Sequence, residues 1–257
     1  MIYLRFTVCH LRFQPRHGCS LICLALLFIL VNSGRAVTND FFAQGIELDR
    51  AGQFPEAAAA FKKSARVQPS TGALLNLGLA EWRRGRAGAA VLAWEQARWI
   101  DPSDKRAETD LKFAREAAQL EEPDLKWFET VSTWLPAGDW VWLAGASLWL
   151  ALGALLLPGV FRWRKAGWQQ MLAALAFGSF LFCLTGNLGV VSRAQIGFVV
   201  KKSAPLLLTP TENGEVVSAL NAGEPARRLR THGKYLYIKS GTGSGWIDQD
   251  NFQLICR

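Results

Sequence analysis

Histidine and cysteine, the side chains behind most metal sites and many nucleophilic sites, are scarce in this chain. Of three histidines in 257 residues, His10 and His17 lie near the N-terminus, which leaves His232 alone in the body of the chain. A histidine-based metal site and a histidine-dependent catalytic triad are therefore not expected. The five cysteines are too few and too unevenly placed for a disulfide scaffold. We predict no metal, no cofactor and no disulfide in the mature chain.

Charged residues are also sparse, at 19%, whereas 50% of the residues are hydrophobic. Such a chain is not dominated by disorder. The net charge of +8 arises largely at the N-terminus and in the short segment 162–165, because residues 37–139 carry 13 basic and 16 acidic side chains. A nucleic-acid partner needs a concentrated basic face, so none is expected.

The first long stretch without charge covers residues 18–34. It follows Arg5, Arg12 and Arg16, with no acidic residue between them, and has a short apolar centre. Small residues, Gly34 and Ala36, follow at the positions that matter for cleavage. This pattern predicts a secretory signal peptide over residues 1–36, cleaved after Ala36. An uncleaved N-terminal anchor is the alternative.

Two further stretches without charge, 140–161 and 166–192, are long enough to cross a bilayer, which takes about 20 residues. The segment between them carries three positive charges and no acidic residue. The positive-inside rule therefore predicts membrane helices 139–161 and 169–191 joined by a cytoplasmic loop, 162–168. Both flanking segments then lie outside the cytoplasm, at the bacterial inner (plasma) membrane. Tryptophans flank both spans as an aromatic belt would: Trp134, Trp140, Trp142, Trp163 and Trp168.

An internal repeat occupies residues 38–120. Gly45, Gly52, Ala57, Phe61 and Pro69 recur 33 positions later as Gly78, Gly85, Ala90, Trp94 and Pro102. The pattern resembles the tetratricopeptide repeat, a helix-turn-helix unit of about 34 residues. We predict repeats at 38–69 and 71–102, a capping helix at 104–120 with Leu111, Phe113 and Ala114 on its apolar side, and a linker at 121–138.

The resemblance implies a groove, lined by the first helix of each repeat, that binds an extended peptide. The candidate partner-binding residues are Phe42, Ile46, Leu75, Asn76, Leu79, Trp82 and Arg83. Alternatively, Leu79 and Trp82 only pack against neighbouring helices. Some repeats of this family clamp a C-terminal carboxylate, but only Asn76 and Arg106 match that clamp, so an apolar groove is the better hypothesis.

From residue 196 the pattern changes to short apolar runs separated by turn residues, which predicts five or six strands in a small closed barrel. The runs ending in Gly245-Trp246-Ile247 resemble a bacterial SH3-type domain over residues 196–257. Tyr235, Tyr237 and Trp246 either form an aromatic peptide groove or partly fill the core. The glycine-rich segment 241–245 is predicted to be a hairpin turn and not a phosphate loop, because a strand follows it.

The predicted fold class is a multi-domain membrane protein: an all-α tetratricopeptide array, a two-helix transmembrane hairpin and a small all-β SH3-like barrel. This order of parts resembles the BatE-type proteins of the Bacteroides aerotolerance operon. The resemblance implies work beside membrane-bound von Willebrand factor A-type subunits and a cytosolic MoxR-type ATPase, in envelope maintenance or tolerance of oxidative stress. It supplies no catalytic residues.

We therefore expect a non-enzymatic inner-membrane adaptor whose two protein-interaction modules are presented outside the cytoplasm, with other membrane proteins and the lipid bilayer as partners. A peptidoglycan-binding envelope sensor or anchor, acting through the SH3-type domain, is the alternative. An enzyme is not expected, because the one acidic cluster, Glu121, Glu122 and Asp124, lies in the predicted linker beside Pro123 and suggests solvated charge.

Overall fold

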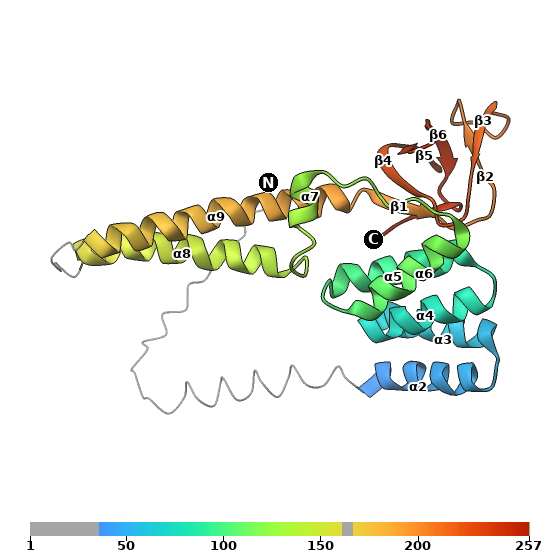
Figure 1. The fold of residues 1–257 in the computed structure, drawn as a ribbon, viewed down its shortest axis with the longest axis horizontal. Coiled ribbons are helices and arrows are strands. Elements are labelled where there is room, and N and C mark those ends of the chain that lie inside the picture. Colours follow the sequence, from blue (N-terminus) through green and yellow to red (C-terminus); the bar gives the residue numbers. More distant parts are fainter. Residues whose placement is uncertain (1–35, 161–166, 257) are drawn as a thin grey trace, which may run out of the picture.

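The computed structural model describes residues 36–160 and 167–256. The signal-peptide prediction lies outside the described residues apart from Ala36, where the first helix begins. Most of the predicted cytoplasmic loop, including its basic residues and Trp163, lies outside them as well. The described residues form a helical array, a long helical hairpin and a β-sheet domain (Figure 1).

Five helices form the array; four fall within the predicted repeats and capping helix, and α2 begins two residues before the first predicted repeat. They are α2 (Ala36–Arg50), α3 (Phe54–Val67), α4 (Thr71–Arg83), α5 (Ala87–Ile100) and α6 (Lys105–Ala118). Consecutive helices pack side by side, and the array has one continuous apolar core. The 33-residue repeat therefore predicted the helices and their boundaries closely.

One glycine in each repeat, Gly45 or Gly78, allows the two helices of that repeat to approach closely. A Cβ atom added at Gly78 would lie 2.3 Å from Nε1 of Trp94, and one added at Gly45 would lie 2.6 Å from the Phe61 ring. The aromatic side chain of the second helix thus fills the space that glycine leaves on the first. The predicted role of these glycines is confirmed in both repeats.

The turns within the repeats need glycine for a different reason. Gly52 and Gly85 have φ angles of 75° and 73°, a left-handed conformation that side chains with a Cβ rarely adopt. They follow the ends of α2 and α4, as the repeat pattern predicted. The turn between the repeats ends at Ser70, whose hydroxyl accepts a hydrogen bond from the Ala73 amide and caps α4.

The hairpin consists of α8 (Asp139–Val160) and α9 (Gly167–Arg193), and both are long and apolar enough to span a membrane. The helices run antiparallel, and their register is fixed near the domains by Trp140, which is 1% exposed. Its ring packs where Gly186 has no side chain, and its carbonyl accepts a hydrogen bond of 3.2 Å from Asn187. Helix α9 extends two residues beyond the predicted span at each end.

The predicted linker 121–138 contains a helix that the sequence analysis missed. Helix α7 (Trp127–Val131) packs against α9 at Gly189, where an added Cβ would lie 2.3 Å from the Phe128 carbonyl oxygen. Five residues are too few to show helical periodicity, so this helix depends on tertiary contacts. Glu121, Glu122 and Asp124 are exposed, as predicted.

The sheet domain has seven antiparallel strands in the order β3-β2-β6-β5-β4-β1-β7. They are β1 (Ile196–Val199), β2 (Ala204–Leu207), β3 (Val216–Leu220), β4 (Pro225–His232), β5 (Tyr235–Ser240), β6 (Ser244–Asp248) and β7 (Phe252–Leu254). Five or six strands were predicted, and β7 was missed because it is only three residues long. Between residues 193 and 256 no recorded pairing joins the edge strands β3 and β7, so the ladder is not closed as the predicted barrel required.

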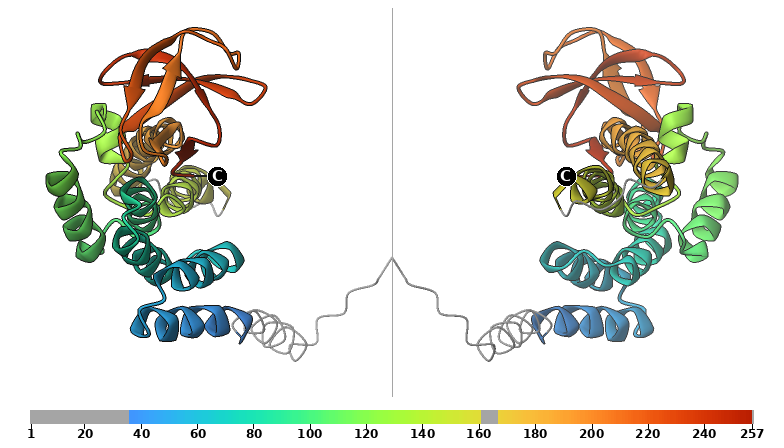
Figure 2. Two further views of the ribbon diagram at one scale, coloured as in Figure 1. Left: turned by 90° about the vertical axis from the view of Figure 1, so that its right-hand side faces the viewer. Right: turned by 90° about the vertical axis from the view of Figure 1, so that its left-hand side faces the viewer.

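The helical array and the sheet pack directly against each other. Ile196 and Phe198 of β1, with Ile255, are buried in the core of the array. Gly88, at the start of α5, lies so close to β1 that an added Cβ would be 2.4 Å from the Val199 carbonyl oxygen. Viewed along the hairpin, the sheet lies above the level of α9 and most of the helical array lies below it (Figure 2). The two modules are therefore docked and not separated by a free linker.

The Gly78–Trp94 contact makes a prediction about stability. Gly78→Ala should destabilise the array by about 1–3 kcal/mol, because the Trp94 ring must move out of a packed core. Gly72→Ala in the same helix is the matched control, since its added Cβ would meet only the Phe42 ring at 3.9 Å. Thermal unfolding of both variants measures the difference, and equal midpoints would contradict the packing argument.

Candidate partner-binding surfaces and the interdomain junction

The predicted groove residues of the array divide into buried and accessible ones. Leu75 is 7% exposed and lies in the core, so its side chain is not part of the accessible surface. The cause is the tight pairing of α4 with α5, in which Trp94 donates a hydrogen bond to the Leu75 carbonyl. Phe42 and Ile46 are half-buried and pack against the same core.

The polar groove residues are engaged within the array. Asn76 donates a hydrogen bond of 2.9 Å to the Gly72 carbonyl. Arg83 donates to both carboxylate oxygens of Asp49 at 2.7 Å, and its guanidinium lies 5.1 Å from the Phe54 ring centroid. The Arg83 contacts join α4 to α2 and α3, whereas the Asn76 hydrogen bond lies within α4.

The accessible apolar part of this surface lies on α4 and α6. Leu79 is 36% exposed and Phe113 is 57% exposed. Trp82 is half-buried, with its ring 5.6 Å from that of Phe113 and 6.1 Å from that of Trp94. Phe113 was predicted on the apolar side of the capping helix with Leu111 and Ala114, but of these three only Leu111 and Ala114 are buried. We therefore define the apolar patch of the array as Leu79, Trp82 and Phe113.

On the sheet, the three aromatic candidates do not share one environment. Tyr237 and Trp246 are half-buried, lie directly opposite each other on β5 and β6, and have ring centroids 5.2 Å apart. His232 also contacts Trp246, at 6.1 Å. Tyr235 is 7% exposed beneath Lys234, which agrees with the alternative that part of this aromatic set is buried. Leu236 and Ile238 fill the core, which leaves Tyr237 and Trp246 on the other face of the sheet.

The glycine-rich segment 241–245 contains the hairpin turn between β5 and β6, as predicted, with the turn at 241–243. The Ser240 amide donates a hydrogen bond of 2.8 Å to the Gly243 carbonyl, and β6 begins at Ser244. Since a strand and not a helix follows, this turn lacks the helix N-terminus that a phosphate loop requires.

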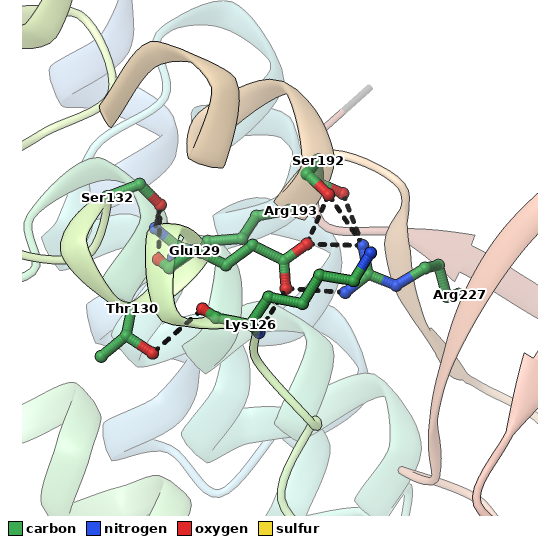
Figure 3. A network of polar contacts seen from close by, with 7 residues as sticks. All are labelled: Lys126, Glu129, Thr130, Ser132, Ser192, Arg193 and Arg227. Carbon is green, nitrogen blue, oxygen red and sulfur yellow. Dashed lines mark hydrogen bonds and ion pairs between the residues drawn. The ribbon is translucent and has the colours of Figure 1, made fainter. Parts of the chain in front are cut away.

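The least expected site is the junction where α7, α9 and β4 meet (Figure 3). Glu129 of α7 has a fully buried side chain, and Arg227 of β4 donates to both of its oxygens, at 2.7 and 2.8 Å. The Lys126 amide donates to the same carboxylate at 2.9 Å, and the Ser192 hydroxyl of α9 donates to it as well. One carboxylate thus connects the short helix α7, the long apolar helix α9 and the sheet.

A second set of contacts lies beside the first. Arg193, the last residue of α9, donates a hydrogen bond of 3.2 Å to the Ser132 hydroxyl, and its guanidinium lies 5.0 Å from the ring of Trp99 in α5. Trp140 of α8 donates to the Ser132 carbonyl at 3.3 Å. The end of α9 therefore contacts α5 through Trp99, the segment after α7 through Ser132, and the sheet through Arg227.

The electrostatics of Glu129 follow from these bonds. Burial raises the pKa of its carboxyl, but hydrogen bonds from Arg227, Ser192 and the Lys126 amide outweigh burial, so the pKa lies below its ordinary value of 4.5. The group is therefore ionised at neutral pH. With all of its nearby donors directed at it, this carboxylate is suited to holding segments together and not to proton transfer.

Sequence reasoning could not find this junction. Glu129 and Arg227 are 98 residues apart, and neither stands in a recognisable pattern. Glu129 follows two aromatic residues in what was predicted to be a linker. For residues 36–160 and 167–256, no group of three or more His, Cys, Asp or Glu side chains is placed to hold a metal ion.

The lowered pKa makes stability at the junction pH-dependent. The pKa of Glu129 is lower in the folded than in the unfolded state, where it has its ordinary value of 4.5. The ionised carboxylate therefore stabilises the fold above pH 4.5, and this stabilisation is lost as the pH falls through the pKa of the folded state. At neutral pH, Glu129→Gln should cost about 3 kcal/mol, because it leaves the half-buried Arg227 without its counter-charge. The difference in Tm between wild type and variant should shrink as the pH falls from about 6 to about 3. A difference that stays constant over this range would contradict the assignment.

Comparison with known proteins supports one part of the chain. Residues 42–103 match the family model of the tetratricopeptide repeat. No curated protein and no solved structure matches the chain. The matched residues run from α2 to the end of the second repeat, so this part of the chain is a tetratricopeptide-repeat module, which implies protein–protein interaction.

Proposed function

We propose that the protein is a non-enzymatic membrane adaptor that presents two interaction modules on one transmembrane hairpin. The observation that carries this proposal is the tetratricopeptide match over residues 42–103, because repeats of this kind bind protein segments. The apolar patch of Leu79, Trp82 and Phe113 supplies an accessible surface for such a segment.

The arrangement of the hairpin supports the anchoring role. Its two helices run antiparallel, so the chain enters α8 and leaves α9 at the same end, and both modules lie at that end (Figure 1). Together with the basic segment 162–165, this favours a location of both modules outside the cytoplasm, on the inner membrane. Two modules on one anchor raise the effective concentration for a second contact once the first has formed.

We further propose that residues 196–257 are a bacterial SH3-type domain and that the whole protein is a BatE-type subunit. The small antiparallel sheet of short strands, the Gly245-Trp246-Ile247 segment and the order of the parts along the chain support this. The partners would then include membrane-bound von Willebrand factor A-type subunits of an envelope complex for tolerance of oxidative stress.

A second candidate function, binding of peptidoglycan by the sheet, is favoured by the exposed cross-strand row on its outer face. Arg230 lies opposite Tyr237, which lies opposite Trp246. Because Ile196, Phe198 and Ile255 are buried against the array, the sheet should be tested within the whole chain. Sedimentation of the detergent-purified protein with peptidoglycan, lost in Trp246→Ala, would favour this function over the first.

Partner capture should depend on the apolar patch of the array. Replacing Leu79 and Phe113 together by glutamate should reduce copurification of membrane partners by about tenfold, because two charges would be buried against an apolar segment. Val67→Glu is the matched control, since Val67 is an exposed apolar residue at the end of α3 outside the patch. The measurement is quantitative mass spectrometry of complexes purified from detergent. Equal recovery with folded wild type and double variant would exclude the patch as a binding surface.

The membrane orientation can be tested with a native thiol. Cys256 is free and exposed in the sheet domain, whereas Cys183 is buried against α8. A membrane-impermeant maleimide should label Cys256 in intact spheroplasts, and Cys256→Ser should abolish that labelling. Labelling that appears only after the membrane is permeabilised would place the sheet in the cytoplasm and refute the proposed orientation.

A further inference from the structure

Two arginines, Arg98 of α5 and Arg193 of α9, flank the contact between Trp99 and the end of α9, and their hydrogen-bonding capacity is not filled. Arg193 is 6% exposed, and within the described part of the chain its one recorded acceptor is the Ser132 hydroxyl. Arg98 lies close enough for the two positive charges to repel each other. The buried Nε of Arg98 has no hydrogen-bond partner among the described residues. A buried donor of this kind is rare in native structures and calls for an acceptor.

The carboxylates nearby are already engaged by other groups. Glu95, 3% exposed, accepts from Nη2 of Arg98 at 2.9 Å and from Nη2 of Arg115 at 2.5 Å. Glu129 is engaged by Arg227, Ser192 and the Lys126 amide. Arg193 therefore has no ion pair in the described part of the chain. The C-terminal ends of α5 and α9 offset part of the positive charge, but they provide no acceptor for the Arg98 Nε.

The depth of Arg193 relative to the hairpin indicates what could supply the acceptor. From Gly167 to Gly186, where α9 meets the start of α8, the helix rises about 30 Å, the thickness of a hydrocarbon core. The Arg193 guanidinium bonds to Ser132, which packs against Gly189, three residues beyond Gly186. This level is about 5 Å outside the hydrocarbon, within the headgroup layer.

We propose that Arg98 and Arg193 form a phosphate-binding site, filled by the phosphate of a membrane phospholipid at the base of the two modules. Guanidinium groups bind phosphate oxygens through paired, charge-assisted hydrogen bonds. A phosphate would provide the Arg98 Nε with an acceptor and Arg193 with a counter-charge. Inorganic phosphate from solution has the same chemistry and is the other possible source. The lipid source depends on the proposed membrane insertion.

The surroundings favour approach along α9 and not through the groove between α5 and α6. That groove is lined by Glu108, Glu116 and Glu122 together with Arg98, Lys112 and Arg115. With three acidic and three basic side chains this groove has no net charge, so it does not favour an anion. On the α9 side the Trp99 ring faces the Arg193 guanidinium. A bound phospholipid would thus tie the tetratricopeptide module to the membrane surface.

The lipid source is tested by native mass spectrometry of the full chain released from nanodiscs. The nanodiscs contain equal parts of phosphatidylglycerol and a phosphate-free diglucosyl diacylglycerol. Wild type should retain the phospholipid in preference to the glycolipid, and Arg98→Gln should lower that preference about tenfold. Arg98→Gln leaves Glu95 paired with Arg115, so the array should stay folded. Arg66→Gln, which removes an exposed arginine from the end of α3, is the matched control and should retain lipid as wild type does.

The solution source is tested by thermal unfolding of the detergent-purified protein in inorganic phosphate and in chloride of equal ionic strength. Stabilisation of wild type but not of Arg98→Gln by phosphate would support the site with solution phosphate as its ligand. Equal lipid preference and equal response to phosphate in folded wild type and Arg98→Gln would overturn the site. Extraction of wild type from membranes by alkaline carbonate would instead refute the membrane insertion, and the phosphate measurement would still test the two arginines.

Discussion

The bidentate ion pair between Glu129 and Arg227 is the contact on which the arrangement of the molecule depends. The carboxylate is completely removed from water, so it is stable there only while Arg227, Ser192 and the Lys126 amide all donate to it. Each donor comes from a different segment. Moving α9, α7 or β4 relative to the others would leave a buried charge without its partners.

This constraint turns separate modules into one body. Only Ala194 and Gln195 lie between α9 and β1, and β1 in turn packs into the core of the helical array. Gly88 allows the backbone of α5 to approach β1, a contact that any side chain would prevent. The apolar patch of the array and the aromatic pair of the sheet are therefore held at a fixed spacing near the base of the hairpin. The proposed adaptor would recognise partners whose own binding segments match that spacing.

The sequence predicted well wherever one residue type is required by one local geometry. Gly78 and Trp94 were identified by their 33-residue repeat, and the structure shows that one occupies the space the other leaves. Prediction failed where the environment comes from a distant segment. Leu75 has a suitable side chain for a binding surface, but α5 packs against its helix and leaves Leu75 in the core. Phe113 follows the apolar pattern of its helix but lies at its edge, and its exposure depends on where the array ends.

By itself the sequence determined the repeated helices, the apolar hairpin and most of the strands, because each follows from a periodicity or a run length within a short window. Tertiary structure alone decided that α7 is a helix, that Glu129 pairs with Arg227 across 98 residues, and that the two modules are docked. The physical reason is that burial of a charge and contact between modules are properties of surfaces brought together by folding. No local pattern encodes them, since the same glutamate in a solvated linker would have the same neighbours in sequence.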